Sequence, residues 1–155
     1  ILLIDVAAGI SEGVTTFTRA AQEVIVVVCD EPASITDAYA LIKVLNREHQ
    51  VHRFQILANM VANNLKGQSV FSKIAAVCDR FLDVSLQYMG AIPHDDYLRS
   101  AVQAQRPVVS HYPSSRSARA FKEVALAADK EERDVLPTGG LEFFIERLVR
   151  AEMDS

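Results

Sequence analysis

Apolar runs alternate with helical patterns along the chain, and this alternation predicts the order of its elements. Consecutive apolar or β-branched residues indicate buried strands of a parallel sheet at 1–5, 23–29, 54–59 and 86–92. Apolar residues recur at helical spacing at 12–22, 34–49, 65–81, 97–105 and 114–128, with Ser34 or Thr36 as the cap of the second helix. Strands joined by such helices imply right-handed crossovers, so we predict an α/β fold with a mainly parallel sheet covered on both faces.

Polar residues follow every predicted strand. The loop of Asp5 to Gly9 follows the first strand, Asp30 follows the second, Asn59 ends the third, and Pro93 begins the turn after the fourth. Parallel strands point their carboxyl ends toward one edge, where ligands bind in the crevice. Each residue alone is an ordinary turn residue, but four such ends together favour a binding site at this edge.

The first nine residues are the most informative stretch. An apolar run ends in Asp5 and a loop of small residues, and an acid at such a strand end commonly serves a magnesium ion beside a nucleotide phosphate. That interpretation needs a glycine-rich phosphate loop with a lysine, and none precedes Asp5, because the chain begins inside the strand. The sequence therefore predicts half of a nucleotide site, and we expect the other half upstream.

Composition narrows the class of protein. The chain has 155 residues, half of them hydrophobic and 23% charged, which suits one domain with a real core. A net charge of −4 argues against a broad nucleic-acid surface. The two cysteines, Cys29 and Cys78, form no CxxC motif and give a disulfide framework or a zinc site little support. Without a signal peptide or an apolar run of about 18 residues, a cytoplasmic protein is expected.

Four strings, in this order and spacing, resemble the later part of the MinD/ParA-type ATPases, which have a deviant phosphate loop. They are ILLIDVAAGI, VVVCDEPASITDAYALIKVL, LANMV and MGAIPHDD. Within that group, DVAAGIS, DEPASITDAY and the tail LEFFIERL are similar to the flagellar number regulators of the FleN/FlhG branch. The resemblance covers about the whole chain and implies the C-terminal part of a Rossmann-like phosphate-loop NTPase, with ATP or ADP and Mg²⁺ as ligands.

The resemblance also implies roles for the first loop. Asp5 matches the family's acid that holds a magnesium-bound water, which makes it both the metal-site and the catalytic candidate. Ala7, Ala8 and Gly9 match a loop whose backbone must approach the γ-phosphate closely. Val6 departs from the pattern, because related chains typically carry Thr or Ser there, and the hydroxyl contact is therefore absent.

The resemblance places the adenine at the later strands. Asn59 matches the side chain that recognises the adenine edge, and an amide offers both a donor and an acceptor for it. Pro93, His94 and Asp95 match the loop that lines the base. A different interpretation is a divalent metal site at His94, Asp95 and Asp96, but three adjacent residues do not easily converge on one ion. Capping of the next helix is the plainer role.

The end of the chain has its own pattern. We predict an ATPase domain over 1–128, a charged, weakly structured linker over 129–138, and an amphipathic helix over 139–155. Leu141, Phe144, Ile145, Leu148 and Val149 form one apolar stripe. We expect this stripe to dock on the ATPase domain first and on a membrane surface second, because glutamates outnumber arginines along the helix.

Two functions follow from these patterns. In the first, ATP joins two copies into a dimer that engages partners, and slow hydrolysis resets it; ATPase activity is expected of the full-length protein. For this branch the resemblance implies a sigma-54-type flagellar activator and a signal-recognition-type GTPase as partners, and peripheral inner-membrane contact. The net charge of −4 leads us to expect no direct nucleic-acid partner. The alternative is a non-catalytic partner-binding module, favoured by Val6 and the lack of a phosphate loop. A response-regulator-like or flavin-binding sheet ranks behind both.

Overall fold

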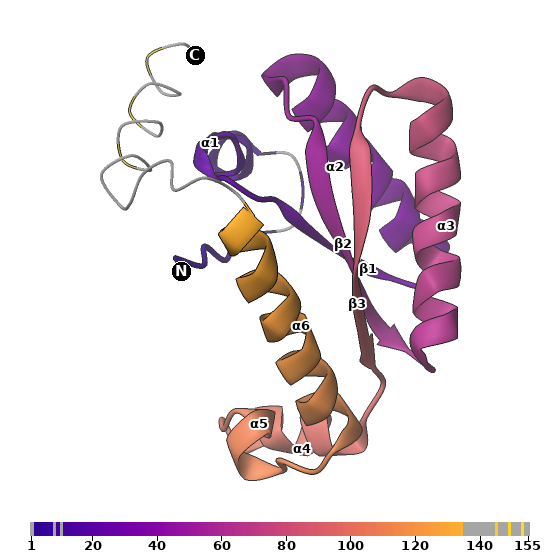
Figure 1. The fold of residues 1–155 in the computed structure, drawn as a ribbon, viewed down its shortest axis with the longest axis vertical. Helices are drawn as coiled ribbons and strands as arrows, with labels where there is room; N and C mark the ends of the chain where they lie inside the picture. Colours follow the sequence, from indigo (N-terminus) through magenta and orange to yellow (C-terminus); the bar gives the residue numbers. More distant parts are fainter. Residues whose placement is uncertain are drawn as a thin grey trace.

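The computed structural model describes residues 2–7, 9, 11–134, 145, 149 and 153. Its helices and strands alternate as the sequence predicts (Figure 1). In chain order they are α1 (Glu12–Ala20), β1 (Ile25–Cys29), α2 (Pro32–His49), β2 (Arg53–Val61), α3 (Asn64–Phe81), β3 (Ser85–Pro93), α4 (Asp96–Gln103), α5 (Val108–His111) and α6 (Arg116–Asp134). The predicted α/β class with a parallel sheet and flanking helices is confirmed. The short helix α5 had no counterpart in the sequence pattern.

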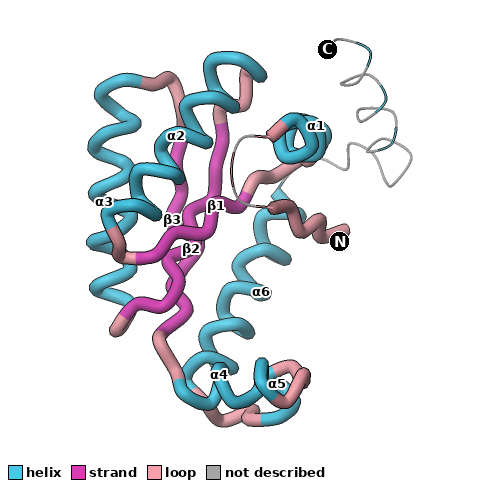
Figure 2. The backbone as a smooth tube through the Cα atoms, turned by 180° about the vertical axis from the view of Figure 1, so that it is seen from behind, coloured by secondary structure: helices cyan, strands magenta, loops and turns pink. Residues whose placement is uncertain are grey.

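The described strands form one parallel sheet in the order β1-β2-β3. Helices α2 and α3 cover one face, and α6 packs against β3 on the other face (Figures 1 and 2). The main core lies between the sheet and the α2–α3 layer, where Ile42, Leu45, Phe54, Ile56 and Ile74 are almost completely buried. This layer fixes the register of β1 and β2, because a one-residue slip would turn the core side chains outward.

The predicted strand at residues 1–5 is wrong for the described residues 2–5. Residues 2–7 have no regular secondary structure, and the side chains of Leu2 and Leu3 are 57% and 80% exposed. The physical reason is that a strand needs a neighbouring strand for its backbone hydrogen bonds. Among the described strands β1 pairs only with β2, and no described strand pairs with residues 2–5. An apolar run alone does not make a strand.

Strand β1 is covered on one face, whereas the sequence predicted burial on both. Val26 and Val28 are buried, but Val27 between them is 54% exposed. Successive side chains of a strand point to opposite faces, and α2 covers only the face of Val26 and Val28. On the other face, α6 lies over β3 rather than over β1.

Helix α2 begins earlier than predicted. Pro32 occupies its first turn, where a missing N–H costs nothing, and Glu31 is the capping residue. The predicted caps are inside the helix instead. Ser34 Oγ accepts the Cys29 backbone N–H at 3.0 Å, and the Thr36 hydroxyl donates to the Pro32 carbonyl. Ser34 therefore ties the first turn of α2 to the end of β1.

Helix α3 approaches the sheet closely at Gly67. A Cβ atom there would lie 2.5 Å from Tyr88 Oη and 2.8 Å from Ala91 Cβ, so only glycine fits without a shift. Asn63 caps the helix by accepting the Lys66 backbone N–H at 2.9 Å. The close approach brings α3 directly over β2 and β3.

Helix α6 continues to Asp134, so the prediction of weak structure at residues 129–134 is wrong. Lysine, glutamate and arginine in this segment are strong helix formers, and their charge does not prevent a helix. The rest of the predicted linker lies outside the described residues, as does most of the predicted tail helix. Of the latter, Ile145, Val149 and Met153 are helical and exposed. Among the described residues, no helix has the length and apolarity needed to span a bilayer.

Candidate functional site

The carboxyl ends of the three strands gather at one edge of the sheet. Cys29 lies opposite Asn59 in the β1–β2 register, and Val61 lies opposite Pro93 in the β2–β3 register. The His94 backbone N–H donates to the Val61 carbonyl at 2.9 Å, which extends the pairing past the end of β3. The structure therefore brings Asn59, Pro93 and His94 together at the edge where ligands bind in parallel sheets.

Asn59 stands at an irregular point of β2. Its Oδ1 accepts the backbone N–H of Met60 at 3.0 Å, and Met60 has a positive φ of 55°. The register to β3 shifts between Ala58 and Val61, so β2 bends here. Such irregularities re-aim side chains and are frequent next to binding sites. The half-buried Asn59 therefore lies at an irregular point of β2, where the pairing with β3 is interrupted, rather than in a regular stretch of strand.

Asp95 is committed to hydrogen bonds inside the protein. Its Oδ1 accepts the Tyr97 N–H at 3.0 Å, and its Oδ2 accepts both the backbone N–H and the hydroxyl of Ser117 at 2.9 Å. These donors, first of all the Ser117 N–H, hold the pKa of Asp95 below its ordinary value. The predicted capping role is confirmed, because Asp95 is the N-cap of α4.

The neighbours of Asp95 differ in exposure. Pro93 is buried, whereas His94 and Asp96 are exposed. The rejected metal site at His94, Asp95 and Asp96 finds no support, since the described part of the chain holds no group of three His, Cys, Asp or Glu side chains able to bind an ion.

Helix α6 holds both loops at this edge. Ser117 binds Asp95 in the loop after β3, and the Arg116 guanidinium donates to the Ala62 carbonyl in the loop after β2 at 2.7 Å. The two anchoring residues are adjacent in the first turn of α6. A single helix start therefore fixes the positions of the loops that follow β2 and β3.

An ion cluster that sequence reasoning missed lies beside β1. Asp30 accepts Lys66 Nζ at 3.1 Å and Lys73 Nζ at 2.9 Å. The two lysine hydrogen bonds, that of Lys73 foremost, hold the pKa of Asp30 below its ordinary value. The available signal was the seven-residue spacing of the lysines, which places both on one face of α3. The cluster ties the loop after β1 to α3.

The first loop does not reach this edge. Asp5 and Ala7 lie in the irregular, exposed segment 2–7, and Gly9 is exposed with a φ of 107°. Figures 1 and 2 both draw the segment 2–7 beside the last turns of α6, whereas the ends of β2 and β3 lead into α3 and α4. Ala8 lies outside the described residues. The structure thus places Asn59, Pro93 and His94 at one edge of the sheet but does not bring the segment 2–7 to that edge.

A parallel sheet whose strands end together and lead into covering helices is the architecture of phosphate-loop NTPases. Residues 2–151 match the family model described as "4Fe-4S iron sulfur cluster binding proteins, NifH/frxC family". The chain belongs to this family, as a FleN/FlhG-like member of its MinD/ParA branch.

Curated relatives agree with this placement. The chain is 55% identical to the antiactivator FleN of Pseudomonas aeruginosa, over 97% of this chain and 54% of that protein. It is 29% identical to the flagellum site-determining protein YlxH of Helicobacter pylori, over 96% of this chain and 51% of the relative. It is 24% identical to the septum site-determining protein MinD of Bacillus subtilis, over 80% of this chain and 45% of that protein. The chain spans about half the length of the curated relatives it matches.

The iron–sulfur cluster in the family description does not fit this chain. Such clusters are held by cysteine thiolates that converge on one place, and the cysteines of this sequence are Cys29 and Cys78. Cys29 ends β1 at the carboxyl edge, while Cys78 lies in the last turn of α3, which returns to the opposite edge. Burial raises the pKa of the Cys78 thiol to about 11, so it stays protonated at neutral pH.

Proposed function

We propose that this chain is part of a MinD-like ATPase switch that regulates flagellar number through ATP-dependent dimerisation and partner binding. The observation that carries the proposal is the gathering of Asn59, Pro93 and His94 at one sheet edge, in a chain 55% identical to an antiactivator FleN. The name of the YlxH relative, a flagellum site-determining protein, supports the same process.

The proposed ligands are ATP or ADP with Mg²⁺. Asn59 recognises the adenine edge, because its amide carries both a donor and an acceptor. Pro93 and His94 line the base, and Asp95 acts as a positioning residue that fixes their loop through Ser117. In this proposal Asn59, Pro93 and His94 form one side of the base pocket.

Asp5 holds a magnesium-bound water, and the backbone of Ala7, Ala8 and Gly9 approaches the γ-phosphate. A magnesium ion held there would supply neutralisation of phosphate charge. For these roles the first loop must move from the position drawn in Figures 1 and 2 to the carboxyl edge. Asp5 and the loop are thus the part of the site that changes when nucleotide arrives.

The proposed partners follow the family branch. They are a second copy of the protein, a sigma-54-type flagellar transcriptional activator that is restrained, and a signal-recognition-type GTPase that is stimulated. The Pseudomonas relative is named an antiactivator, which supports the restraint of a transcriptional activator. A cytoplasmic location with peripheral inner-membrane contact, made by the tail helix over 139–155, completes the proposal.

The test measures ATP binding and turnover by the full-length protein. Asn59→Ala should weaken ATP binding about tenfold, because one base-edge hydrogen-bonding group is worth roughly 1–1.5 kcal/mol. Asp5→Ala should abolish turnover and leave adenine binding largely intact. Gln103→Ala, an exposed amide on α4, is the matched control and should change neither.

A second candidate is a partner-binding module without hydrolysis. Two features favour it: Val6 stands in place of a hydroxyl residue, and the segment 2–7, which contains Asp5, lies away from the edge (Figure 1). A full-length protein that binds its partners but shows no turnover, with Asp5→Ala indistinguishable from the native chain, would replace the switch with this module.

A further inference from the structure

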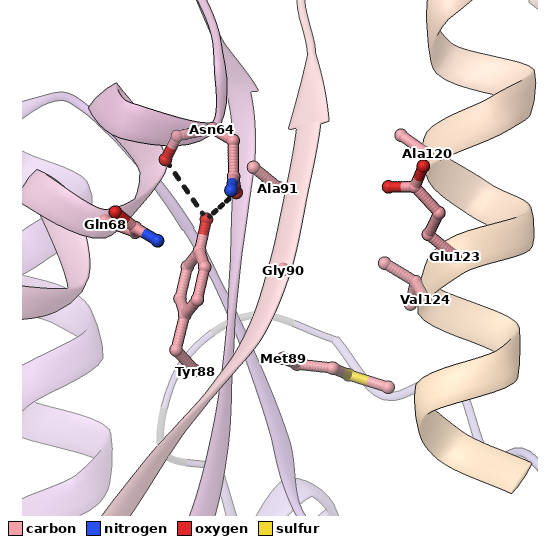
Figure 3. Close-up of a pocket in the computed structure, with 9 residues that line it drawn as sticks. All are labelled: Asn64, Gln68, Tyr88, Met89, Gly90, Ala91, Ala120, Glu123 and Val124. Carbon is pink, nitrogen blue, oxygen red and sulfur yellow. Dashed lines mark hydrogen bonds between the residues drawn. The ribbon is translucent and has the colours of Figure 1, made fainter. Parts of the chain in front are cut away.

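A cavity of about 370 Å³ lies at the outer edge of β3, beside the first turns of α3. Figure 3 shows β3 between two helices, with α3 on one side and α6 on the other. The side chains of Tyr88 and Gln68 lie on the α3 side, and those of Met89 and Glu123 lie on the α6 side. The floor between them is the backbone of β3 at Gly90 and Ala91.

The floor of this cavity is an unpaired strand edge. Among the described strands β3 pairs only with β2, so its outer backbone groups have no ladder partner. Folded proteins usually protect such edges with lysine, proline, a β-bulge or a covering segment. The register between β2 and β3 shifts between Ile56 and Leu57, so β3 has one such irregularity at Met89. Here the stretch from Tyr88 to Ala91 carries neither a charge nor a proline, and Gly90 has no side chain to cover the backbone.

The walls of the cavity carry a definite chemistry. Tyr88 Oη donates to Asn64 Oδ1 at 2.7 Å, so the phenol is held against α3. Val124 and Met89 make the α6 side apolar near the floor. Among the described residues lining the cavity, Glu123 carries the only charge, and Figure 3 shows its carboxylate directed toward the groove.

We propose that this groove binds an extended segment of a partner protein, which adds a strand to β3 and places a basic side chain against Glu123. Main-chain hydrogen bonds to an exposed edge supply affinity in this mode, and pockets for alternate side chains supply specificity. Because side chains alternate along a strand, the basic residue lies on the α6 side and its two neighbours face Tyr88 and Gln68.

The recessed edge selects this occupant over a second copy of the chain. Residues of α3 and α6 flank β3 on both faces, so the edge lies at the bottom of a groove. The β3 edge of another copy would be recessed between its own helices, and the two edges could not meet. A single extended segment has no such helices and reaches the floor.

The experiment uses the full-length protein without nucleotide, so its outcome is independent of the proposed ATP switch. The probes are fluorescently labelled hexapeptides of alternating valine and threonine. In each peptide one position is replaced by arginine, alanine or glutamate, and the set covers all six positions. Binding is measured by fluorescence anisotropy. We expect arginine peptides to bind and glutamate peptides not to bind, and N-methylation of the peptide backbone should remove binding, because it removes the N–H donors of the added strand.

Protein variants locate the site. Glu123→Lys should weaken binding of the arginine peptides at least tenfold. Glu48→Lys, the same charge change at an exposed position on α2, should leave it unchanged. Both positions are exposed on helices, and circular dichroism verifies that both variants fold.

Four outcomes would overturn the proposal. They are an array without any bound peptide, binding that Glu123→Lys does not change, self-association of the protein that Glu123→Lys abolishes, and peptide binding that requires removal of residues 135–155. The third outcome would identify a second copy as the occupant, and the fourth would identify the chain's own tail.

Discussion

The two halves of the proposed nucleotide site differ in how they are built. Asn59, Pro93 and His94 are held by strand register and by hydrogen bonds from neighbouring loops. Asp5 and Ala7 lie in an exposed segment that no described strand pairs with. The adenine half therefore follows from the packing of this chain on itself, whereas the phosphate half needs a partner strand, a ligand or both.

The largest expected effect tests this difference in packing. In the 155-residue chain, Phe54→Ala should lower the free energy of unfolding by about 3–5 kcal/mol, because it leaves a cavity beneath the β2 core. Leu3→Ala should change it by no more than about 0.5 kcal/mol, since the side chain is exposed. Urea denaturation measures both values. A loss of more than about 1 kcal/mol for Leu3→Ala would mean that the first segment is packed after all.

A pair of glycines sharpens the comparison at intermediate size. Gly67→Ala should destabilise the chain by about 1–3 kcal/mol, because the new Cβ would meet Tyr88 Oη and Ala91 Cβ. Gly13→Ala in α1 meets nothing within 4 Å and should stabilise by up to about 1 kcal/mol through helix propensity. Thermal denaturation compares the two variants. Equal effects of the same sign would contradict the close approach of α3 to the sheet.

The smallest effect concerns the loop that positions Pro93 and His94. Asp95→Ala should cost about 0.5–2 kcal/mol at pH 7, the range for losing a helix cap. The pKa of Asp95 is lowered from 3.8 in the folded protein, so its contribution is present above pH 3.8 and is lost as the pH falls through the folded pKa. The difference in stability between native and variant chains should therefore shrink below pH 3.8. A difference that stays constant down to pH 2 would exclude this carboxylate as its source.

The sequence predicted most of the fold because the relevant signals are local. The continuous runs of β1, β2 and β3 and the periodic patterns of α1, α2, α3 and α4 predicted these seven described elements to within two residues. Residues 2–5 carry the same apolar signal, but whether such a run becomes a strand depends on a neighbour, which composition does not reveal. The exposure of Val27 has the same cause, because a strand's second face is covered or open according to distant elements.

The site was predictable to the extent that parallel strands end together. That rule and the family resemblance predicted Asn59 and Pro93 as residues at this edge. The capping role of Asp95 was predicted from its place before α4. The Asp30 cluster with Lys66 and Lys73 was missed, since its partners lie more than thirty residues away on another helix. The β3 groove was missed for the same reason: Glu123 meets β3 only through tertiary packing.

The first turn of α6 has a thermodynamic consequence. Arg116 and Ser117 make hydrogen bonds to the loops after β2 and β3, respectively. Glu123, two turns further along the same helix, borders the groove beside β3. One helix therefore touches both places, the loops through its first turn and the groove through Glu123. Any change in affinity that occupancy of one place causes at the other is reciprocal by thermodynamic linkage.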